Sequence, residues 1–536
     1  MIEHGYHHNW LVDSLPAAAV TDSEDGETTS YSRGVPVGYV DKDKDKIYVY
    51  NHVQLIVKYH ETQNGARVVG IYAEPYSVRH KFAAGVQVPS ASQESKNAAL
   101  NSDSVKTCTG YPMTRTDANF AGPQELIPGG QIIYTYDVVW EPSDVAWASR
   151  WDIYLNTHDE TLNNVHWFSI VNAVIIVLTL GAILAVILVR SLRADLSRYN
   201  EERQSLVEGG LEDVDESGWK VVHADVFRPP QYPGLLCACV ASGAQLGVMA
   251  LLVLGFAYVG FVSPANRGSL LMALLATYAL VGGVAGYVQA RLYKALGGQR
   301  WSATTAATAA LFPCTCGIVY LGLDVALLAK KSSGAVPVLV FGQLVALFLF
   351  VVVPLTYLGA AAGFSKATIE WPARASKIER PVPPQPATLS LPLASLVCGV
   401  VPFGASFVEL YFVLDSLWME AYYYLFGFAA CGFILLVLAA AEVASLLTYY
   451  TLCAENHRWW WRAFLAPATT GLYVFGYAAY YYGAHLQDEA FDVLQAGLFF
   501  GYMALVALGV ALVAGAAGFL ASLKFLAYIF AQIKFD

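Results

Sequence analysis

The pattern of hydrophobic positions divides the chain into two unequal parts near residue 165. Beyond that point nine apolar stretches follow one another, each with the ~20 residues that a helix needs to cross a bilayer. They predict membrane spans near 167–189, 235–261, 269–290, 303–329, 336–362, 390–414, 421–450, 463–483 and 493–529. We therefore expect a polytopic α-helical membrane protein, with a nine-helix transmembrane domain over 166–530.

Residues 1–165 show a different pattern, typical of β structure. Three segments are rich in β-branched and aromatic residues and are separated by turn-forming clusters: Lys46 to His60, Ala66 to Glu74 and Gln131 to Trp140. The alternating charges from Asp41 to Lys46 predict an exposed hairpin tip. A segment of this length can fold by itself, so we expect a β-rich N-terminal domain.

The distribution of charge predicts the orientation in the membrane. Hydrophobic residues make up 56% of the chain and charged residues 14%, and Lys and Arg gather in alternate loops, near 190–233, 291–301, 363–388 and 451–462. By the positive-inside rule these loops and the C-terminus are expected to be cytosolic, with residues 1–165 lumenal. The net charge of −10 argues against a nucleic-acid partner.

The first residues, MIEHGYHHNW, have neither the charged n-region nor the apolar h-region of a signal peptide. An exported domain needs such a signal, so we expect the natural protein to have a further N-terminal part. Cys108 is the single cysteine of residues 1–165, which is consistent with an incomplete domain.

Several long motifs are more specific than composition. They are YSRGVPVGY (31–39), AEPYSVRH (73–80), WASRWDIYL (147–155), GWKVVHADVFRPP (218–230), SPANRG (263–268), GYVQARLYKALGGQRW (286–301), VPFGASFVELYFVLDSLW (401–418), CAENHRWWWRAF (453–464) and the final QIKFD. In this order and spacing the chain resembles the nonaspanin family, the transmembrane-nine superfamily of endomembrane protein 70-like proteins.

This resemblance implies a multi-pass protein of Golgi and endosome membranes that assists the sorting, localisation and surface delivery of other membrane proteins. It implies no catalysis and no cofactor. The clients that it implies are membrane proteins with glycine-rich transmembrane segments. Besides sorting, a purely structural scaffold that joins the ectodomain to a cytosolic coat is possible, and a transport function is considered below.

The C-terminal tail, residues 531–536, is interpreted as a sorting signal. Lys534, Phe535 and Asp536 form Lys-x-Asp, like the motif that binds COPI coatomer in this family. One cation and two carboxylates on a short peptide suit capture in a charged pocket. The alternative is that Lys534 only anchors the last span at the interface.

Small residues recur at i, i+4 spacing in three spans. These candidates for helix packing or client docking are Gly282 and Gly286, Gly359 and Gly363, and the pairs Ala511 with Gly515 and Ala514 with Gly518. Such faces let a second helix approach closely. They predict packing within the bundle, with docking of client helices as the alternative.

Three carboxyl residues fall inside the predicted spans: Asp324, Glu409 and Glu442. A charge there costs at least ~2.5 kcal/mol and usually has a partner or a cavity. For Asp324 we expect a structural pairing near Lys330 and Lys331. Glu409 and Glu442 have no Lys or Arg in their spans, so they are candidates for an intramembrane polar site. An ion or small-solute transporter or channel is therefore the alternative function.

Other chemistry has weaker support. Cys314 with Cys316, and His4 with His7 and His8, could bind a metal, but both patterns are more typical of packing or surface residues, so no metal site is expected. The chain has no phosphate loop, nucleophile elbow or HExxH motif. Trp459 to Trp461 are expected in an interfacial aromatic belt. The segment 218–230 either caps the bundle or binds a cytosolic partner.

Overall fold

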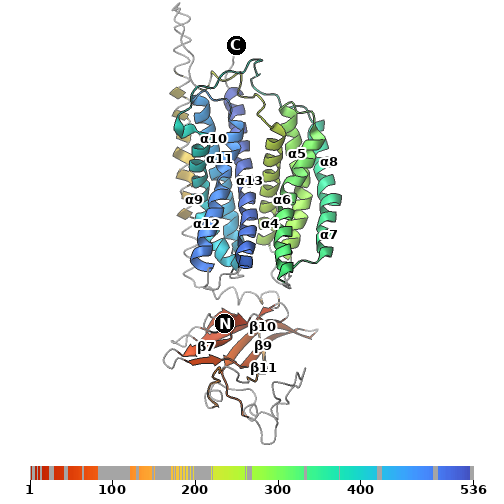
Figure 1. The fold of residues 1–536 in the computed structure, drawn as a ribbon, viewed down its shortest axis with the longest axis vertical. Helices are drawn as coiled ribbons and strands as arrows, with labels where there is room; N and C mark the ends of the chain where they lie inside the picture. The colour runs from red at the N-terminus through yellow and green to blue at the C-terminus, as the bar shows by residue number, and fades with distance from the viewer. Residues whose placement is uncertain are drawn as a thin grey trace, which may run out of the picture. The chain divides into compact units, whose positions relative to one another are not determined.

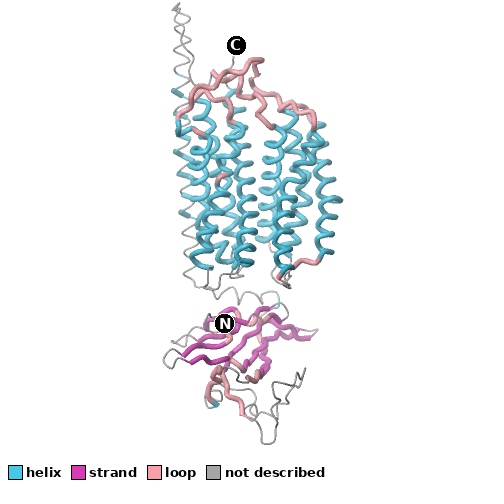
Figure 2. The backbone as a smooth tube through the Cα atoms, viewed as in Figure 1, coloured by secondary structure: helices cyan, strands magenta, loops and turns pink. Residues whose placement is uncertain are grey.

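A computed structural model describes most of residues 2–81, 121–150 and 171–531, and the longest stretches that it leaves out are 82–120, 151–170 and 198–218. The chain divides into two compact units, Met1–Asn163 and Asn164–Asp536 (Figure 1). The first unit contains strands and the second is helical (Figure 2). The expected fold class, a polytopic membrane protein with a β-rich N-terminal region, is confirmed.

The N-terminal unit is built on a five-stranded sheet with the order β11-β9-β10-β4-β5. Its strands are β4 (Ala18–Asp22), β5 (Thr29–Arg33), β9 (His52–Thr62), β10 (Gly65–Tyr76) and β11 (Thr135–Pro142). β9 and β10 form an antiparallel hairpin with a bulge between Val68 and Gly70, while β11 runs parallel to β9. The core of this unit includes Leu15, Val53 and Ile71.

Three short strand pairs complete the described part of this unit. They are β1 (His7–His8) with β6 (Val35–Pro36), β2 (Leu11–Val12) with β3 (Leu15–Pro16), and β7 (Gly38–Asp41) with β8 (Lys46–Val49). Asp41 lies opposite Lys46, where β7 and β8 pair, and residues 42–45 lie outside the described residues.

The run Lys46 to His60 is divided between β8 and β9. The reason is Asn51, whose side-chain amide donates to the carbonyls of Val78 and Ile133 and accepts from the Val78 N–H. The Asn51 side chain is therefore buried and joins its own segment to those of Val78 and Ile133. It would not reach these partners from the middle of a continuous strand.

The helical unit contains α4 (Pro233–Tyr258), α5 (Ser269–Ala295), α6 (Trp301–Ala329), α7 (Val338–Leu347), η4 (Phe348–Val352), α8 (Val353–Ser365), η5 (Ala387–Leu389), α9 (Leu391–Trp418), α10 (Leu425–Cys453), α11 (Trp460–Ala468), α12 (Thr470–Tyr481), η6 (Tyr482–Leu486) and α13 (Val493–Ala531). In Figure 1, α13 lies between α9–α12 on one side and α4–α8 on the other.

Within the described part of the chain, seven helices are long and apolar enough to cross a membrane. They correspond to the second to seventh and the ninth predicted spans. The eighth predicted span coincides with α11, α12 and η6, and the described residues of the first, between 171 and 197, are all helical. α7 and α8 form one span through the π turn η4, which precedes Pro354 and accommodates the donor that proline lacks.

Loops gather at the end of the bundle where α13 ends (Figure 2). α13 has 39 residues and is about 58 Å long at 1.5 Å per residue, well beyond the ~30 Å hydrocarbon core. Its last turns therefore leave the apolar layer and pack against the loops. Phe530 contacts Trp219 and Phe227 there, edge to face.

Candidate functional site

The glycines of α5 and α8 form a backbone-to-backbone contact. A Cβ atom at Gly286 would lie 1.9 Å from the carbonyl oxygen of Thr356, and one at Gly359 would lie 1.9 Å from that of Gly283. Gly282 and Gly363 lie along the same contact, where added Cβ atoms would meet Thr356 and Ala290. Both faces are thus filled by the chain's own helices.

The small residues of α13 also face the inside of the bundle. A Cβ atom at Gly515 would meet the ring of Phe464 at 2.8 Å, and one at Gly518 would meet Pro467 at 2.6 Å. Ala511 lies opposite Gly471 of α12, and Ala514 is completely buried. A client helix at any of these positions would have to displace a helix of the protein itself.

The three intramembrane carboxyls do not come together. Asp324 lies on α6, which packs on α4, α5, α8 and α13, whereas Glu409 and Glu442 lie on α9 and α10. The expected pairing of Asp324 with lysine is wrong for Lys330, because no ion pair joins these two described residues. The Asp324 carboxylate instead accepts from the Val336 N–H at 2.7 Å, in the loop before α7.

Glu409 is 7% exposed, and neither carboxyl oxygen has a hydrogen bond from any residue that the structure describes. Its side chain lies against Gly432 of α10, where an added Cβ atom would be 2.8 Å from Glu409 Cγ. Glu442 lies against Gly181 of the first predicted span, where an added Cβ atom would be 2.5 Å from Glu442 Oε1. Each carboxyl therefore lies beside a glycine on a neighbouring helix.

Three segments form a layer that we call the loop cap: residues 219–231, 371–389 and 453–462. Asp225 lies at its centre, 4% exposed, and Arg228 donates to Asp225 Oδ1 through Nε at 2.9 Å and through Nη2 at 2.5 Å. The Arg380 N–H donates to the other oxygen at 3.3 Å, and Arg228 also reaches the Ser376 carbonyl. The described residues of the segment 218–230 therefore cap the bundle.

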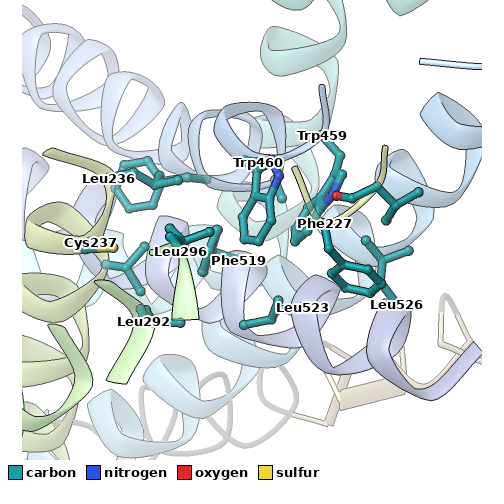
Figure 3. Close-up of a cluster of buried hydrophobic side chains, with 14 of the residues drawn as sticks. Phe227, Leu236, Cys237, Leu292, Leu296, Trp459, Trp460, Phe519, Leu523 and Leu526 are labelled. Atoms are coloured by element: carbon teal, nitrogen blue, oxygen red, sulfur yellow. The ribbon is translucent and has the colours of Figure 1, made fainter. Parts of the chain in front are cut away.

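Tryptophans join the loop cap to the helices. Trp459 donates to the Val226 carbonyl, and Trp461 donates to that of Gln231. Trp459 and Trp460 are stacked on each other and packed on Phe519 of α13 (Figure 3). The expectation of an interfacial aromatic belt is wrong for these two residues, because both are fully buried. The indole of Trp459 has a backbone partner in this core, whereas Trp460 Nε1 has none among the described residues.

The rim of the loop cap carries exposed charge. Glu379 accepts from Arg458 at 2.8 Å and lies 3.2 Å from His457 Nε2. The hydrogen bonds from Arg458 and His457 lower the pKa of the Glu379 carboxyl. Arg380 reaches Glu455 at 3.3 Å. These exposed pairs orient the loops more than they stabilise them.

The N-terminal unit contains a partly buried polar chain that we call the histidine chain: His80, Thr135, His52 and Asp137. Thr135 Oγ1 lies 3.0 Å from His80 Nε2 and 2.7 Å from His52 Nδ1, and His52 Nε2 lies 3.5 Å from Asp137 Oδ2. Burial lowers the pKa of both histidines, and with the nearby His52 it brings that of His80 to about 4. Both rings are therefore neutral near pH 7.

Other candidate residues have no comparable setting. The tail residues Lys534, Phe535 and Asp536 lie outside the described residues, as do Cys108 and His4. Cys314 is exposed on α6, and His7 and His8 are exposed on β1. No group of three or more His, Cys, Asp or Glu side chains that could bind a metal occurs among the described residues.

The family model of endomembrane protein 70 matches residues 1–491 of this chain. The chain belongs to the transmembrane 9 superfamily. It is 38% identical over 538 residues to transmembrane 9 superfamily member 10 of Arabidopsis thaliana, covering 99% of this chain and 81% of the relative. It is 35% identical over 553 residues to human member 4, with 100% and 81% covered, and 36% identical over 558 residues to human member 2, with 99% and 78% covered. No solved structure matches the chain.

Sequence reasoning singled out the segment 218–230 as a possible cap but missed the histidine chain and the distant partners of Asp225 and Arg228. His52 and Thr135 are 83 positions apart, and Arg228 and Ser376 are 148 apart, so no local spacing could reveal these contacts. A signal was nevertheless present in the quoted motifs, since HADVFR contains both Asp225 and Arg228, and AEPYSVRH ends on His80.

Proposed function

We propose that this transmembrane 9 protein assists the sorting, localisation and surface delivery of other membrane proteins, without catalysis, in Golgi and endosome membranes. The observation that carries the proposal is the family match along most of the chain, together with relatives that align over nearly all of it. Its clients are membrane proteins with glycine-rich transmembrane segments. Its N-terminal unit faces the lumen and its C-terminus the cytosol.

The structure supports a role in recognition. The loop cap fastens the chain's loops to one end of the bundle through buried groups, which leaves a rigid helical unit beneath it. The Glu409 carboxyl, inside an apolar span, has no hydrogen-bond partner among the described residues. A transporter would need a series of polar groups, and the separation of Asp324 from Glu409 and Glu442 argues against one path through all three.

The C-terminal tail provides a test of whether the COPI coat keeps the protein in Golgi membranes. Lys534, Phe535 and Asp536 would present one cation and two carboxylates to COPI coatomer. We expect the double change Lys534→Ala with Asp536→Ala to abolish capture of coatomer and to release the protein from Golgi membranes. Phe535→Ala is the matched control, because it keeps Lys-x-Asp. Unchanged capture and location in the double variant would leave Lys534 as a membrane anchor.

The sorting role itself is tested by removing the protein from cells. Reporters that differ only in one transmembrane segment, rich in glycine or in leucine, would be followed to the cell surface. We expect loss of the protein to reduce surface delivery of the glycine reporter and to leave the leucine reporter unchanged. Equal delivery of both reporters with and without the protein would refute the role.

A further inference from the structure

One segment of the loop cap, residues 380–386, is rich in proline and reads RPVPPQP. Proline fixes its own φ near −65°, and the residue before a proline is restricted to extended conformations. Every residue from Arg380 to Pro386 is either a proline or precedes one. The sequence of this segment therefore favours a polyproline II helix, which is the form that aromatic-lined grooves of other proteins recognise.

The structure has this conformation. Residues 379–386 form neither an α-helix nor a strand, although they connect two long helices, α8 and α9. Pro386 has φ −62° and ψ 148°, close to the polyproline II values of about −75° and +145°. The segment is therefore an extended helix without the internal hydrogen bonds of other helices.

Both ends of the segment are fixed to other parts of the loop cap. The Arg380 N–H donates to Asp225 Oδ2 at 3.3 Å, and Gln385 Nε2 donates to the Ala454 carbonyl at 3.0 Å. A segment that already has its bound conformation loses little conformational entropy when a partner binds it. The loop cap therefore prepares the segment for recognition.

One edge of the polyproline II helix faces the protein, and the other two face away. With three residues per turn, residues three apart lie on the same edge, about 9 Å from each other. Val382 and Gln385 share the half-buried edge, from which Gln385 reaches Ala454. The two outer edges form what we call the proline ridge, which consists of the half-buried Pro383 and the exposed residues Arg380, Pro381, Pro384, Pro386 and Ala387.

The proline ridge has a cation at one end. The Arg380 side chain is 43% exposed and lies 3.3 Å from Glu455, in an ion pair that is itself open to solvent. Such a pair adds little to stability, so the guanidinium can exchange Glu455 for a carboxylate of a partner. A charge at one end of an otherwise uniform ridge fixes the direction in which a groove binds it.

We propose that residues 380–387 bind a cytosolic domain of the SH3 type, with an aromatic-lined groove over the proline ridge and an acidic side chain beside Arg380. This inference goes beyond the proposed function and rests on its assignment of the loop cap to the cytosol. It gives the loop cap a second role, as the contact between the helical unit and a cytosolic protein.

Binding to the full chain in detergent tests the contact. The probes are purified SH3 domains, with purified WW domains as a second class of proline-binding module. We expect an SH3 domain to bind the unchanged chain, and Pro383→Ala with Pro384→Ala to weaken this binding about tenfold. Pro372→Ala changes another exposed proline of the loop cap and is the matched control, which should bind as before.

A role as a stiff connector between α8 and α9 would give a different result. It predicts that the proline variants lower the melting temperature and that no SH3 domain binds. Pro384→Glu changes one exposed position, and it serves if the double variant loosens the loop cap. Arg380→Gln keeps the N–H that Asp225 accepts and should weaken binding about threefold, less at high salt. Absence of SH3 binding, binding unchanged in the proline variants, or binding by WW domains alone overturns the proposal.

The side of the membrane is tested separately. Ala387→Cys places a thiol at the exposed end of the ridge, in cells whose plasma membrane alone is permeabilised. We expect a membrane-impermeant maleimide to label this variant more than the unchanged chain. No additional label would put the segment in the lumen and overturn both this inference and the proposed orientation. If the thiol is labelled, no SH3 domain binds and the glycine reporter still needs the protein, the proposed function stands and only this contact is wrong.

Discussion

Two buried carboxyls of the helical unit have almost the same exposure and opposite surroundings. Asp225 in the loop cap is 4% exposed, and Glu409 on α9 is 7% exposed. Asp225 accepts hydrogen bonds from Arg228 and from the Arg380 N–H. Glu409 accepts none from any described side chain. Burial alone therefore does not assign a role to a carboxyl group.

The difference lies in what each group contributes to the free energy of folding. A carboxylate with its hydrogen bonds made holds its surroundings together, as Asp225 does for two segments of the loop cap. A buried group without partners lowers stability, and such groups are expected where function requires them. Glu409 is of this second kind, and it lies beside Gly432 of α10.

The largest effect should separate the two kinds of glycine contact. Gly286→Ala would place a methyl group 1.9 Å from the Thr356 carbonyl oxygen, whereas Gly181→Ala would meet Glu442 Oε1, the far end of a flexible side chain, at 2.5 Å. We expect Gly286→Ala to lower the free energy of unfolding by about 3 kcal/mol and Gly181→Ala by less than about 1 kcal/mol. Thermal unfolding in detergent measures both. Equal losses would show that Gly181 packs against α10 as tightly as α5 packs against α8.

The next effect tests the paired carboxyl. Arg228→Ala removes two of the donors of Asp225 and leaves a buried carboxylate with the Arg380 N–H. We expect a loss of about 2 kcal/mol, below the usual range for a fully buried pair because the Arg228 side chain is 24% exposed. Hydrogen exchange in residues 222–231 should increase. Arg458→Ala, which breaks the exposed pair with Glu379, is the control and should leave stability unchanged. If hydrogen exchange in residues 222–231 stays slow in Arg228→Ala, the hydrogen bonds of Asp225 are not what holds the loop cap together.

The membrane spans could be predicted from sequence because a bilayer requires long apolar helices, whatever the packing between them. Glu409 and Asp324 could be singled out for the same reason, since a charged residue in an apolar span is visible without a structure. Their partners could not be predicted. The donor of Asp324 is a backbone N–H in the next loop, which has no signature in residue type.

The role of the tryptophans could not be predicted either. Trp459 and Trp460 follow a charged loop, as interfacial residues do, but α13 extends past the apolar layer and provides Phe519 as a partner. The length of one helix therefore turned an expected lipid-facing belt into a core. Likewise, the glycine spacing predicted close contacts, but which helix fills each face depends on the arrangement of the whole bundle.

A smaller effect of opposite sign tests the unpaired carboxyl. Glu409→Met keeps the volume of the side chain and removes two oxygens that lack partners. We expect the free energy of unfolding to rise by about 1 to 2 kcal/mol. Asp225→Met is the matched comparison and should be destabilising. If Glu409→Met is destabilising too, the carboxyl has a structural partner, and the contrast between the two groups disappears.

The smallest effect extends the comparison to a third, partly buried polar site, the histidine chain of the N-terminal unit. Burial lowers the pKa of His80 from 6.5 to about 4, and that of His52 also falls. Between pH 6.5 and 4 the unfolded chain therefore binds protons that the folded unit does not, so stability is lost as the pH falls through this range. Because His80 is only half-buried, we expect a loss on the order of 1 kcal/mol between pH 7 and pH 5.

Hydrogen exchange of β9 and β11 in the full chain, corrected for the intrinsic rates at each pH, measures this loss. His80→Gln keeps a donor for Thr135 without a titrating ring, so it should flatten the dependence on pH. His8→Gln replaces an exposed ring and should leave the dependence on pH unchanged. A slope that persists in His80→Gln would assign the titration to His52. No slope in the unchanged protein would mean that the histidine chain, like the exposed pairs of the loop cap, adds little to stability, and that a connected polar network need not be a stabilising one.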